Sequence, residues 1–230
     1  SELTDSDPQQ VGLLPKPIIP LSKQAKKTAS LANEFIARAK EALVHSEPAN
    51  MVLLRGFSEH PRFPSFSEIY KLKPAAIAAY PMYRGLAQVV GMEILETGDA
   101  IEDEFDTLIR HYGEYDFFYL HIKQADSAGE DGDFERKARI IEQVDALLPR
   151  LLALKPDVLI ITSDHSTPAV LKSHSWHPVP FVLYSKWCQP DAVREFSERA
   201  CAAGALGRFP ATQIMPLALA HALKLERFGA

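Results

Sequence analysis

The sequence predicts an α/β protein with three layers, in which helices cover both faces of a mostly parallel sheet. Two observations lead to this fold class. From about residue 51 onward, short apolar segments alternate with longer amphipathic ones, as strands alternate with helices in such proteins. In addition, apolar segments such as Val158–Thr162 show no polar alternation, which is typical of strands buried on both faces.

The first half of the chain predicts one long helix followed by short alternating elements. Ser22–His45 carries apolar residues along one helical face, which predicts an amphipathic helix. Ser65 and Glu68 have the spacing of a capping box at the start of a short helix, and Gly91 is the expected C-terminal cap of a later one. The other expected elements are strands at Met51–Leu54, Ala75–Ala79 and Ile94–Leu95, and helices at Tyr83–Val90 and Ile101–Tyr112.

The second half begins with a predicted buried strand at Asp116–Ile122. The polar segment Lys123–Asp133 predicts a loop, and the amphipathic segment Phe134–Leu154 predicts a helix. Val158–Thr162 is the next strand. The remaining expected elements are a strand at Val179–Tyr184 and helices at about Asp191–Ala203 and Thr212–Leu225.

Composition excludes several classes of protein. The chain of 230 residues has a net charge of −5 and no stripe of Lys and Arg, which argues against a nucleic-acid partner. No apolar run approaches membrane-spanning length and no signal-peptide pattern is present, so we expect no membrane partner and a cytoplasmic protein. Two cysteines, Cys188 and Cys201, provide no disulfide framework.

The residues that follow Val158–Thr162 are the strongest candidates for chemistry. Asp164 and His165 come directly after this strand, and His174 precedes the next one. Ligands bind at the carboxyl ends of strands in α/β sheets. Aspartate and histidine are good ligands for divalent ions such as Zn²⁺ or Mn²⁺, so the segment predicts a metal site.

A second acidic group, with Asp126 and Glu130, follows the strand at Asp116–Ile122. Taken alone, it is more simply explained as a solvated turn in which Asp133 caps the next helix. If the strands are neighbours, however, five ligand-type side chains converge on one sheet edge. Such a set would suit two divalent ions, which together clamp the oxygens of a phosphoryl displacement.

At this point the sequence resembles a known family, the cofactor-independent (2,3-bisphosphoglycerate-independent) phosphoglycerate mutases, in the branch common in archaea and some bacteria. These enzymes belong to the alkaline phosphatase superfamily, so the resemblance implies an alkaline phosphatase-like core. It covers most of the chain from about residue 30 onward. The matching segments are Asn50–Gly56, Pro64–Phe66, Ala75–Met92, Tyr115–Lys123, Asp126–Lys137, Ile141–Asp145 and Thr162–Pro180.

The resemblance implies a division of the ligands between two ions. Asp126, Glu130 and His174 would hold one ion, and Asp164 and His165 the other. Glu130 stands where the superfamily commonly has histidine. The glutamate carboxylate adds negative charge and favours harder ions. Mn²⁺ is the expected metal, with Zn²⁺, Mg²⁺ or Co²⁺ as alternatives.

The resemblance also implies the reaction, which is the interconversion of 3-phosphoglycerate and 2-phosphoglycerate through a phosphoenzyme, in glycolysis and gluconeogenesis. The expected partner is therefore a small phosphorylated substrate. Arg84 and Arg55 are the candidates for binding its anionic groups. A surface salt bridge is an equally good explanation for Arg84 and a slightly better one for Arg55.

The family's nucleophilic Ser or Thr and an early Asp have no counterpart in this sequence. The chain is therefore expected to be the C-terminal portion of a longer enzyme, inactive alone, with residues 22–230 in the core domain. Residues 1–21 are expected to be a linker or the end of an inserted substrate domain, because Thr4–Gln9 resembles the end of that domain. Two alternatives stay open, namely a metal-dependent phosphomonoesterase and a non-catalytic metal-binding fragment.

Overall fold

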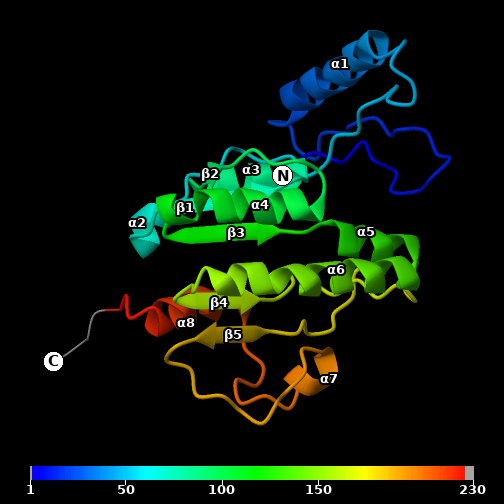
Figure 1. The fold of residues 1–230 in the computed structure, drawn as a ribbon. Coiled ribbons are helices and arrows are strands. Elements are labelled where there is room, and N and C mark those ends of the chain that lie inside the picture. The colour runs from blue at the N-terminus through cyan, green and yellow to red at the C-terminus, as the bar shows by residue number, and fades with distance from the viewer. Residues whose placement is uncertain (1, 226–230) are drawn as a thin grey trace. The chain divides into compact units, whose positions relative to one another are not determined.

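The computed structural model describes residues 2–225 of the chain (Figure 1). They divide into two compact units, Ser1–Phe63 and Pro64–Ala230, called here the N-terminal and C-terminal units. The predicted assignment of residues 1–21 and 22–230 to two enzyme domains stays a prediction, and residues 226–230 lie outside the described part of the chain.

The N-terminal unit is built on one helix, α1 (Lys26–Ala42), where the sequence predicts a helix over Ser22–His45. Its small buried residues pack against apolar side chains that precede it in the sequence. Asn33 on α1 fixes the preceding segment, since its side chain accepts a hydrogen bond from the backbone N–H of Ile18 and donates one to the Ile18 carbonyl, both at 2.9 Å. The buried cluster consists of Leu3, Ile18, Ala25, Ala29 and Ala32.

The strand predicted at Met51–Leu54 is not present as a strand. Leu54, at the end of this segment, is instead hydrogen-bonded to Ser6. The Ser6 backbone N–H donates to the Leu54 carbonyl at 2.9 Å, and the Leu54 N–H donates to the Ser6 hydroxyl at 2.7 Å. The backbone and the side chain of Ser6 thus pair with Leu54 where a ladder would need a second strand.

The C-terminal unit contains the predicted parallel sheet. Its strands are β1 (Pro74–Ala78), β2 (Glu93–Ile94) and β3 (Phe117–His121), in the order β2-β1-β3. Both neighbours of β1 run parallel to it. Every residue of β1 is buried, as expected for a central strand without polar alternation.

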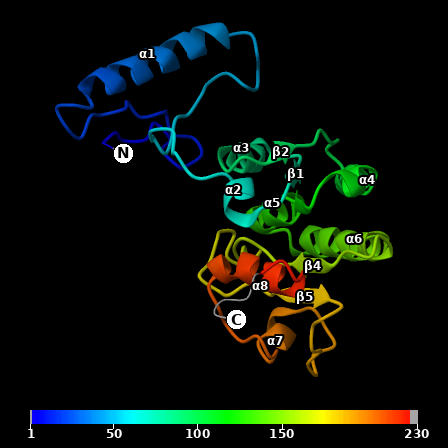
Figure 2. The same cartoon turned by 90° about the vertical axis from the view of Figure 1, so that its left-hand side faces the viewer.

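Helices cover both faces of this sheet, which confirms the predicted fold class. Figure 2 shows α3 (Pro81–Val89) and α4 (Ile101–His111) on opposite sides of β1 and β2. The long helix α6 (Phe134–Ala153) packs beside α4. The main core joins β1, α4 and α6, and its most buried members are Ala75, Ile77, Leu95, Ile101, Phe105, Leu108 and Leu151.

The start of the short helix α2 (Phe66–Tyr70) agrees with the sequence prediction. The Ser65 hydroxyl accepts the N–H of Glu68 at 3.2 Å, and the Glu68 carboxylate accepts the N–H of Ser65 at 2.6 Å, so the capping box is present. Gly91, directly after the C-cap of α3, has φ +78°, as expected of a glycine that ends a helix.

The strand that carries the principal motif pairs differently from the prediction. β4 (Val158–Ile161) forms an antiparallel pair with β5 (Val182–Ser185), separate from the parallel sheet in the described residues. Its residues are half-buried and not fully buried. The physical reason lies in the connection, because a parallel pair needs a crossover element and residues 162–181 contain no helix.

Two further predictions need correction. The predicted loop Lys123–Asp133 is largely a helix, α5 (Gln124–Asp131), which ends at Gly132 with φ +75°. Contact of α5 with α6 overrides the low helix propensity of its Asp, Ser and Gly residues. The helix predicted at about Asp191–Ala203 is reduced to α7 (Glu198–Cys201), and the last helix is α8 (Ile214–His221).

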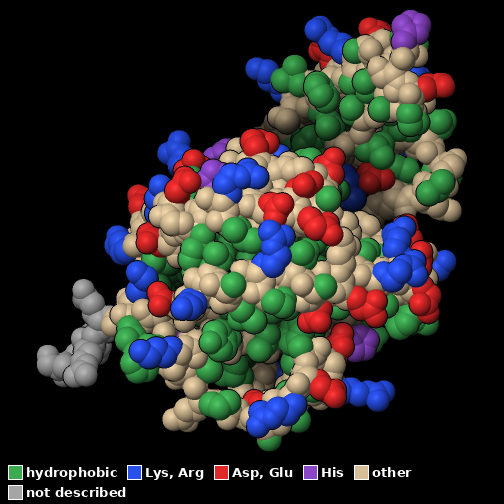
Figure 3. Space-filling view, in the orientation of Figure 1, with side chains coloured by type: hydrophobic (Ala, Val, Ile, Leu, Met, Phe, Trp, Pro, Cys, Tyr) green, Lys and Arg blue, Asp and Glu red, His purple; other side chains and the backbone are tan. Residues whose placement is uncertain are grey.

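Charged side chains of both signs lie on the surface (Figure 3). Figure 3 shows Lys, Arg, Asp and Glu side chains interspersed on the visible face, with hydrophobic side chains exposed between them. Within residues 2–225, no helix combines the length and the apolar character needed to cross a membrane.

Candidate metal centre

Two of the predicted ligands lie on α5, which directly follows β3. Asp126 is in the first turn of this helix and Glu130 lies four residues later, so both side chains project from the same face. A carboxylate in the first turn is favoured by the unpaired N–H groups and the dipole of the helix. The Asp126 side chain is only 15% exposed, whereas that of Glu130 is 47% exposed.

The other three ligands lie on the segment between β4 and β5. Asp164 and His165 follow β4 within three and four residues. His174 is brought back to them by a backbone bridge, in which the Ser175 N–H donates to the Ser166 carbonyl at 2.8 Å. The rings of His165 and His174 consequently lie with their centroids 3.8 Å apart.

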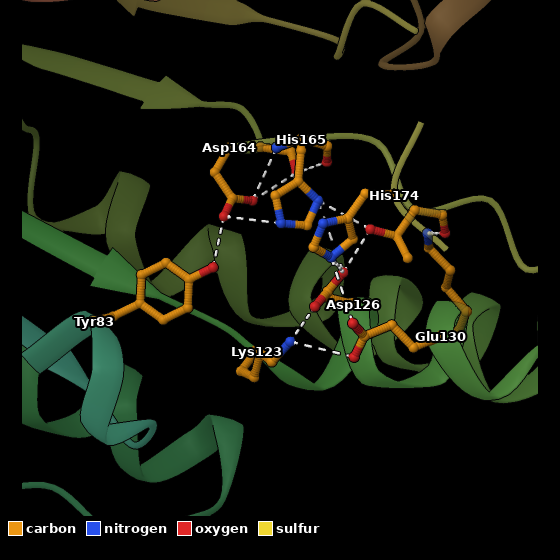
Figure 4. A network of polar contacts seen from close by, with 10 residues as sticks. Tyr83, Lys123, Asp126, Glu130, Asp164, His165 and His174 are labelled. Atoms are coloured by element: carbon orange, nitrogen blue, oxygen red, sulfur yellow. Dashed lines mark hydrogen bonds and ion pairs between the residues drawn. The ribbon is translucent and has the colours of Figure 1, made fainter. Parts of the chain in front are cut away.

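These five side chains converge, and we call them the acid–histidine cluster (Figure 4). His174 Nε2 lies 3.4 Å from a Glu130 oxygen and 3.7 Å from Asp126 Oδ1. His165 Nε2 lies 3.3 Å from Asp164 Oδ2, and its Nδ1 lies 3.8 Å from Asp126 Oδ1. The two groups of ligands expected from the resemblance therefore meet at Asp126 and His165.

Asp126 has hydrogen-bond partners that keep it ionised. Burial tends to raise its pKa, but hydrogen bonds from Lys123 and Thr167 outweigh this effect and hold the pKa below the ordinary value. The Lys123 ammonium donates to Asp126 Oδ2 and lies 3.6 Å from Glu130. Burial lowers the pKa of Lys123, but the hydrogen bond and the two carboxylates raise it by more.

Asp164 is oriented by an aromatic side chain from α3. The buried Tyr83 hydroxyl donates to Asp164 Oδ2 at 2.6 Å, and the Tyr83 ring stacks on His121 with centroids 3.5 Å apart. Burial raises the pKa of Asp164, yet the Tyr83 hydrogen bond and His165 together lower it below its usual range. Desolvation and the adjacent Asp164 raise the pKa of Tyr83, so it remains a donor.

A glycine allows α5 to approach the segment that follows β4. A Cβ atom on Gly129 would lie 2.4 Å from the carbonyl oxygen of Thr167, which is too close for any other residue without a shift of the backbone. Lys137 on α6 donates to the same carbonyl at 2.6 Å. These contacts hold Asp126 and His165 at the distances given above.

The two predicted anion-binding arginines form ion pairs. Arg84 at the start of α3 lies 2.5 Å from a Glu96 oxygen, and Arg55 in the N-terminal unit lies 3.3 Å from an Asp7 oxygen. Their role in binding a substrate stays a prediction.

Sequence reasoning did not single out two residues that contact the ligands, Thr167 and Tyr83. Thr167 is two residues beyond His165, and Tyr83 is next to Arg84. Each lies a few residues after the end of a strand, and this position was the feature of the sequence that could have indicated them. A hydroxyl that orients a ligand, however, has no sequence pattern of its own.

The donor set fits a divalent metal ion. Among the described residues, Asp126, His165 and His174 each offer one ligand atom within 4.8 Å of the others. Carboxylate and imidazole ligands suit Mn²⁺ and Zn²⁺. Glu130 and Asp164 contact the histidines of this set and extend it toward the ligand number that two ions need.

Comparison with curated proteins gives relatives of high identity. The chain is 52% identical over 231 residues to a probable 2,3-bisphosphoglycerate-independent phosphoglycerate mutase of Thermotoga neapolitana and covers 57% of it. The corresponding protein of Thermus thermophilus is 50% identical over 232 residues, again with 57% covered. In each case 99% or more of this chain is matched, so it spans little more than half the length of these relatives.

Two solved structures are also similar to the chain. A Pyrococcus horikoshii protein matches with a TM-score of 0.80 and 30% identity, over 90% of this chain and 60% of that one. A cofactor-independent phosphoglycerate mutase from Thermoplasma acidophilum matches with a TM-score of 0.63 and 25% identity, over 96% of this chain and 59% of that one. The model of the metalloenzyme superfamily matches residues 25–221. The chain, with its acid–histidine cluster at the strand ends, therefore belongs to the metalloenzyme superfamily.

Proposed function

We propose that this chain carries most of the two-metal site of a phosphoglycerate mutase, which interconverts 3-phosphoglycerate and 2-phosphoglycerate through a phosphoenzyme. The observation that supports it best is the convergence of two ligand groups, Asp126, Glu130 and His174 on one side and Asp164 and His165 on the other. The names of the relatives point to the same reaction.

In this proposal the chain's residues hold two divalent ions close together. Mn²⁺ is the expected ion, and Zn²⁺, Mg²⁺ or Co²⁺ are alternatives. When bound, the ions would supply the positive charge that stabilises a transferring phosphoryl group. Asp126 and Asp164 are ready for this role because their hydrogen-bond partners keep the pKa of each below its usual value.

The rest of the proposed site concerns the substrate. Arg84 would exchange its exposed partner Glu96 for a phosphate or carboxylate group, since a guanidinium can bind either anion with two parallel hydrogen bonds. Arg55 is proposed for the same purpose. We expect the attacking hydroxyl in the part of the relatives that this chain does not cover, so the 230 residues alone would be inactive.

Hydrolysis of phosphomonoesters is the second candidate, because the same ions and carboxylates would serve if water resolved the phosphoenzyme. The difference between the two reactions lies in how the glycerate is retained, and Arg84 and Arg55 are the candidates in this chain for that role. A non-catalytic metal-binding fragment is the third candidate.

The first test is calorimetric titration of the purified chain with Mn²⁺, next to Asp126→Ala. We expect one site that the variant loses, because Asp126 contacts both histidines of the cluster. Two tight sites would contradict the expectation that part of the second site lies outside the chain. The absence of binding would contradict the metal site in this chain.

The second test asks which reaction the residues support. The chain would replace the matching segment of the Thermotoga maritima relative, to which it is 50% identical over 232 residues. ³¹P NMR with 3-phosphoglycerate should show 2-phosphoglycerate, and Asp126→Asn in the chimera should abolish it. Release of inorganic phosphate alone would favour the phosphomonoesterase. Conversion by the 230-residue chain alone would refute the fragment interpretation.

A further inference from the structure

Thr167, which is not one of the predicted ligands, contacts the acid–histidine cluster at two of its members. Its side chain is buried, with 3% of the residue exposed. Its hydroxyl contacts Asp126 Oδ1 at 2.5 Å and His165 Nδ1 at 3.0 Å. It therefore touches one ligand from each of the two expected ligand groups.

The directions of these two hydrogen bonds follow from counting protons. A threonine hydroxyl has one hydrogen to donate, and an ionised carboxylate can only accept. The Thr167 hydroxyl lies 2.5 Å from Asp126 Oδ1 and donates its hydrogen to that carboxylate oxygen. Toward His165 the hydroxyl can then only accept, so His165 Nδ1 must carry the hydrogen of that contact.

This assignment determines what the other nitrogen of His165 can do. In a neutral imidazole with a hydrogen on Nδ1, Nε2 carries a lone pair. That lone pair lies 3.3 Å from Asp164 Oδ2, which is itself an acceptor. Two acceptors at this separation repel each other unless a proton or a cation offsets the repulsion, so His165 Nε2 and Asp164 would both be available as ligands for a divalent ion.

Thr167 is itself firmly placed by two helices. Its carbonyl accepts from the Lys137 ammonium of α6 at 2.6 Å, and the absence of a side chain at Gly129 lets α5 approach the same carbonyl. The hydroxyl is thereby presented at the junction of α5 and the segment after β4, where the two ligand groups meet.

We propose that Thr167 is a positioning residue that links the two ligand groups, by orienting Asp126 and by fixing His165 in the tautomer whose Nε2 is free for a metal ion. The proposal rests on the proposed metal function for its purpose, but the hydrogen-bond assignment is testable without metal. Residues that orient ligands in this way typically contribute 10- to 100-fold to metal affinity.

The first experiment reads the tautomer directly in the metal-free chain. Two-bond ¹H–¹⁵N correlation spectra of ¹⁵N-histidine-labelled protein distinguish the two tautomers at a pH where histidine is neutral. The His165 signals are identified by their loss in His165→Gln. We expect the Nδ1–H tautomer in the wild type and in Thr167→Ser, and its loss in Thr167→Val, which keeps the shape and removes the hydroxyl. An Nε2–H tautomer in the wild type would overturn the proposal.

The second experiment measures Mn²⁺ affinity by calorimetry for the same proteins. Thr167→Val should weaken binding about 10- to 100-fold, and Thr167→Ser should restore most of it. The matched control is Thr107→Val, which removes another buried hydroxyl, one that contacts the Thr97 hydroxyl at 3.3 Å. It should leave both the affinity and the tautomer unchanged.

The outcomes separate this proposal from the proposed function. If the wild type binds no Mn²⁺, and the Nδ1–H tautomer of His165 is present in the wild type but lost in Thr167→Val, the metal site is refuted and the positioning role is supported. A Thr167→Val variant with unchanged tautomer would refute the positioning role, whether its metal affinity falls or not.

Discussion

Two carboxyl groups of the C-terminal unit, Asp126 and Glu104, have opposite electrostatic surroundings. Asp126 accepts hydrogen bonds from Lys123 and Thr167, and its pKa is lowered. Glu104 on α4 is fully buried. One of its oxygens accepts the Ala79 N–H at 3.0 Å, and the other has no partner among the described residues. Burial raises the pKa of Glu104 to about 7.

The comparison shows that partners, more than burial, decide what a buried acid can do. Both groups lose water, which favours the protonated form. Only Asp126 recovers that loss through a cation and a hydroxyl, so only Asp126 is ready to bind a metal ion at neutral pH. Glu104 is instead a buried polar residue whose raised pKa keeps it protonated up to near neutral pH.

The largest expected effect is on Mn²⁺ affinity and comes from removing the Asp126 carboxylate. Asp126→Ala should lower Mn²⁺ affinity by more than about 100-fold, because loss of a ligand exceeds the 10- to 100-fold typical of supporting residues. The control is Asp131→Ala on the same helix, whose carboxylate pairs with Arg136 at the surface. Calorimetry of both variants checks the prediction, and equal losses would show that only the net charge of α5 matters.

Glu104→Gln should change the pH dependence of stability. The folded chain keeps the Glu104 proton up to about pH 7, whereas the unfolded chain releases it near the ordinary value of 4.5. Between these values Glu104 binds more protons in the folded state than in the unfolded state. The contribution of Glu104 to the free energy of unfolding therefore falls as pH rises and is constant above the folded pKa. One pKa unit corresponds to about 1.4 kcal/mol, so the variant should gain on the order of 3 kcal/mol relative to the wild type from about pH 4 to pH 8.

Denaturant unfolding at a series of pH values measures this gain. Glutamine retains an oxygen for the Ala79 N–H, so the fold should be kept. A constant difference between variant and wild type across the pH range would show that Glu104 is not protonated in the folded state.

Gly129→Ala should separate α5 from the segment after β4. The added methyl would meet the Thr167 carbonyl at 2.4 Å, and such overpacking typically costs about 1–3 kcal/mol. Gly85→Ala in α3 is the contrasting control, because nothing lies within 4 Å of its added Cβ. That change should stabilise the helix by up to about 1 kcal/mol. Thermal unfolding gives both values, and a Gly129→Ala variant as stable as the wild type would contradict the close approach at Gly129.

Tyr83→Phe removes one hydrogen bond, the one to Asp164. A hydrogen bond to a charged group contributes about 1.5–3 kcal/mol at most, and the phenyl ring still stacks on His121. The pKa of Asp164 should rise, which carboxyl ¹³C NMR can follow. Tyr70→Phe is the control, because the Tyr70 ring contacts Phe66 on α2. An unchanged pKa of Asp164 in Tyr83→Phe would mean that the Tyr83 hydrogen bond does not lower it.

The fold class and the residues that converge were accessible from sequence. Strands such as Pro74–Ala78 are apolar throughout, and the ligands directly follow two of them. The direction in which Val158–Ile161 pairs was not accessible from its composition, because an apolar run fits either a parallel or an antiparallel partner. The absence of a helical pattern between residues 162 and 181 was the usable clue.

The surroundings of the ligands were also beyond the sequence. Gln124–Asp131 consists largely of turn-forming residues, and its helical state depends on packing against α6. Glu104 looked like one acid among several in an acidic helix, although it is fully buried. Both outcomes depend on tertiary contacts between segments distant in the chain, and local patterns carry no information about these.

The placement of the ligands on two kinds of backbone has a thermodynamic consequence. Asp126 and Glu130 are spaced by one helical turn of α5, so their separation is set before any ion binds. Asp164, His165 and His174 lie on an irregular segment that a backbone bridge between Ser166 and Ser175 closes. Any conformational freedom of that segment that an ion removes reduces the affinity by the corresponding entropy. The strength of metal binding can therefore be tuned through the length and stiffness of residues 166–175, without exchange of a single ligand.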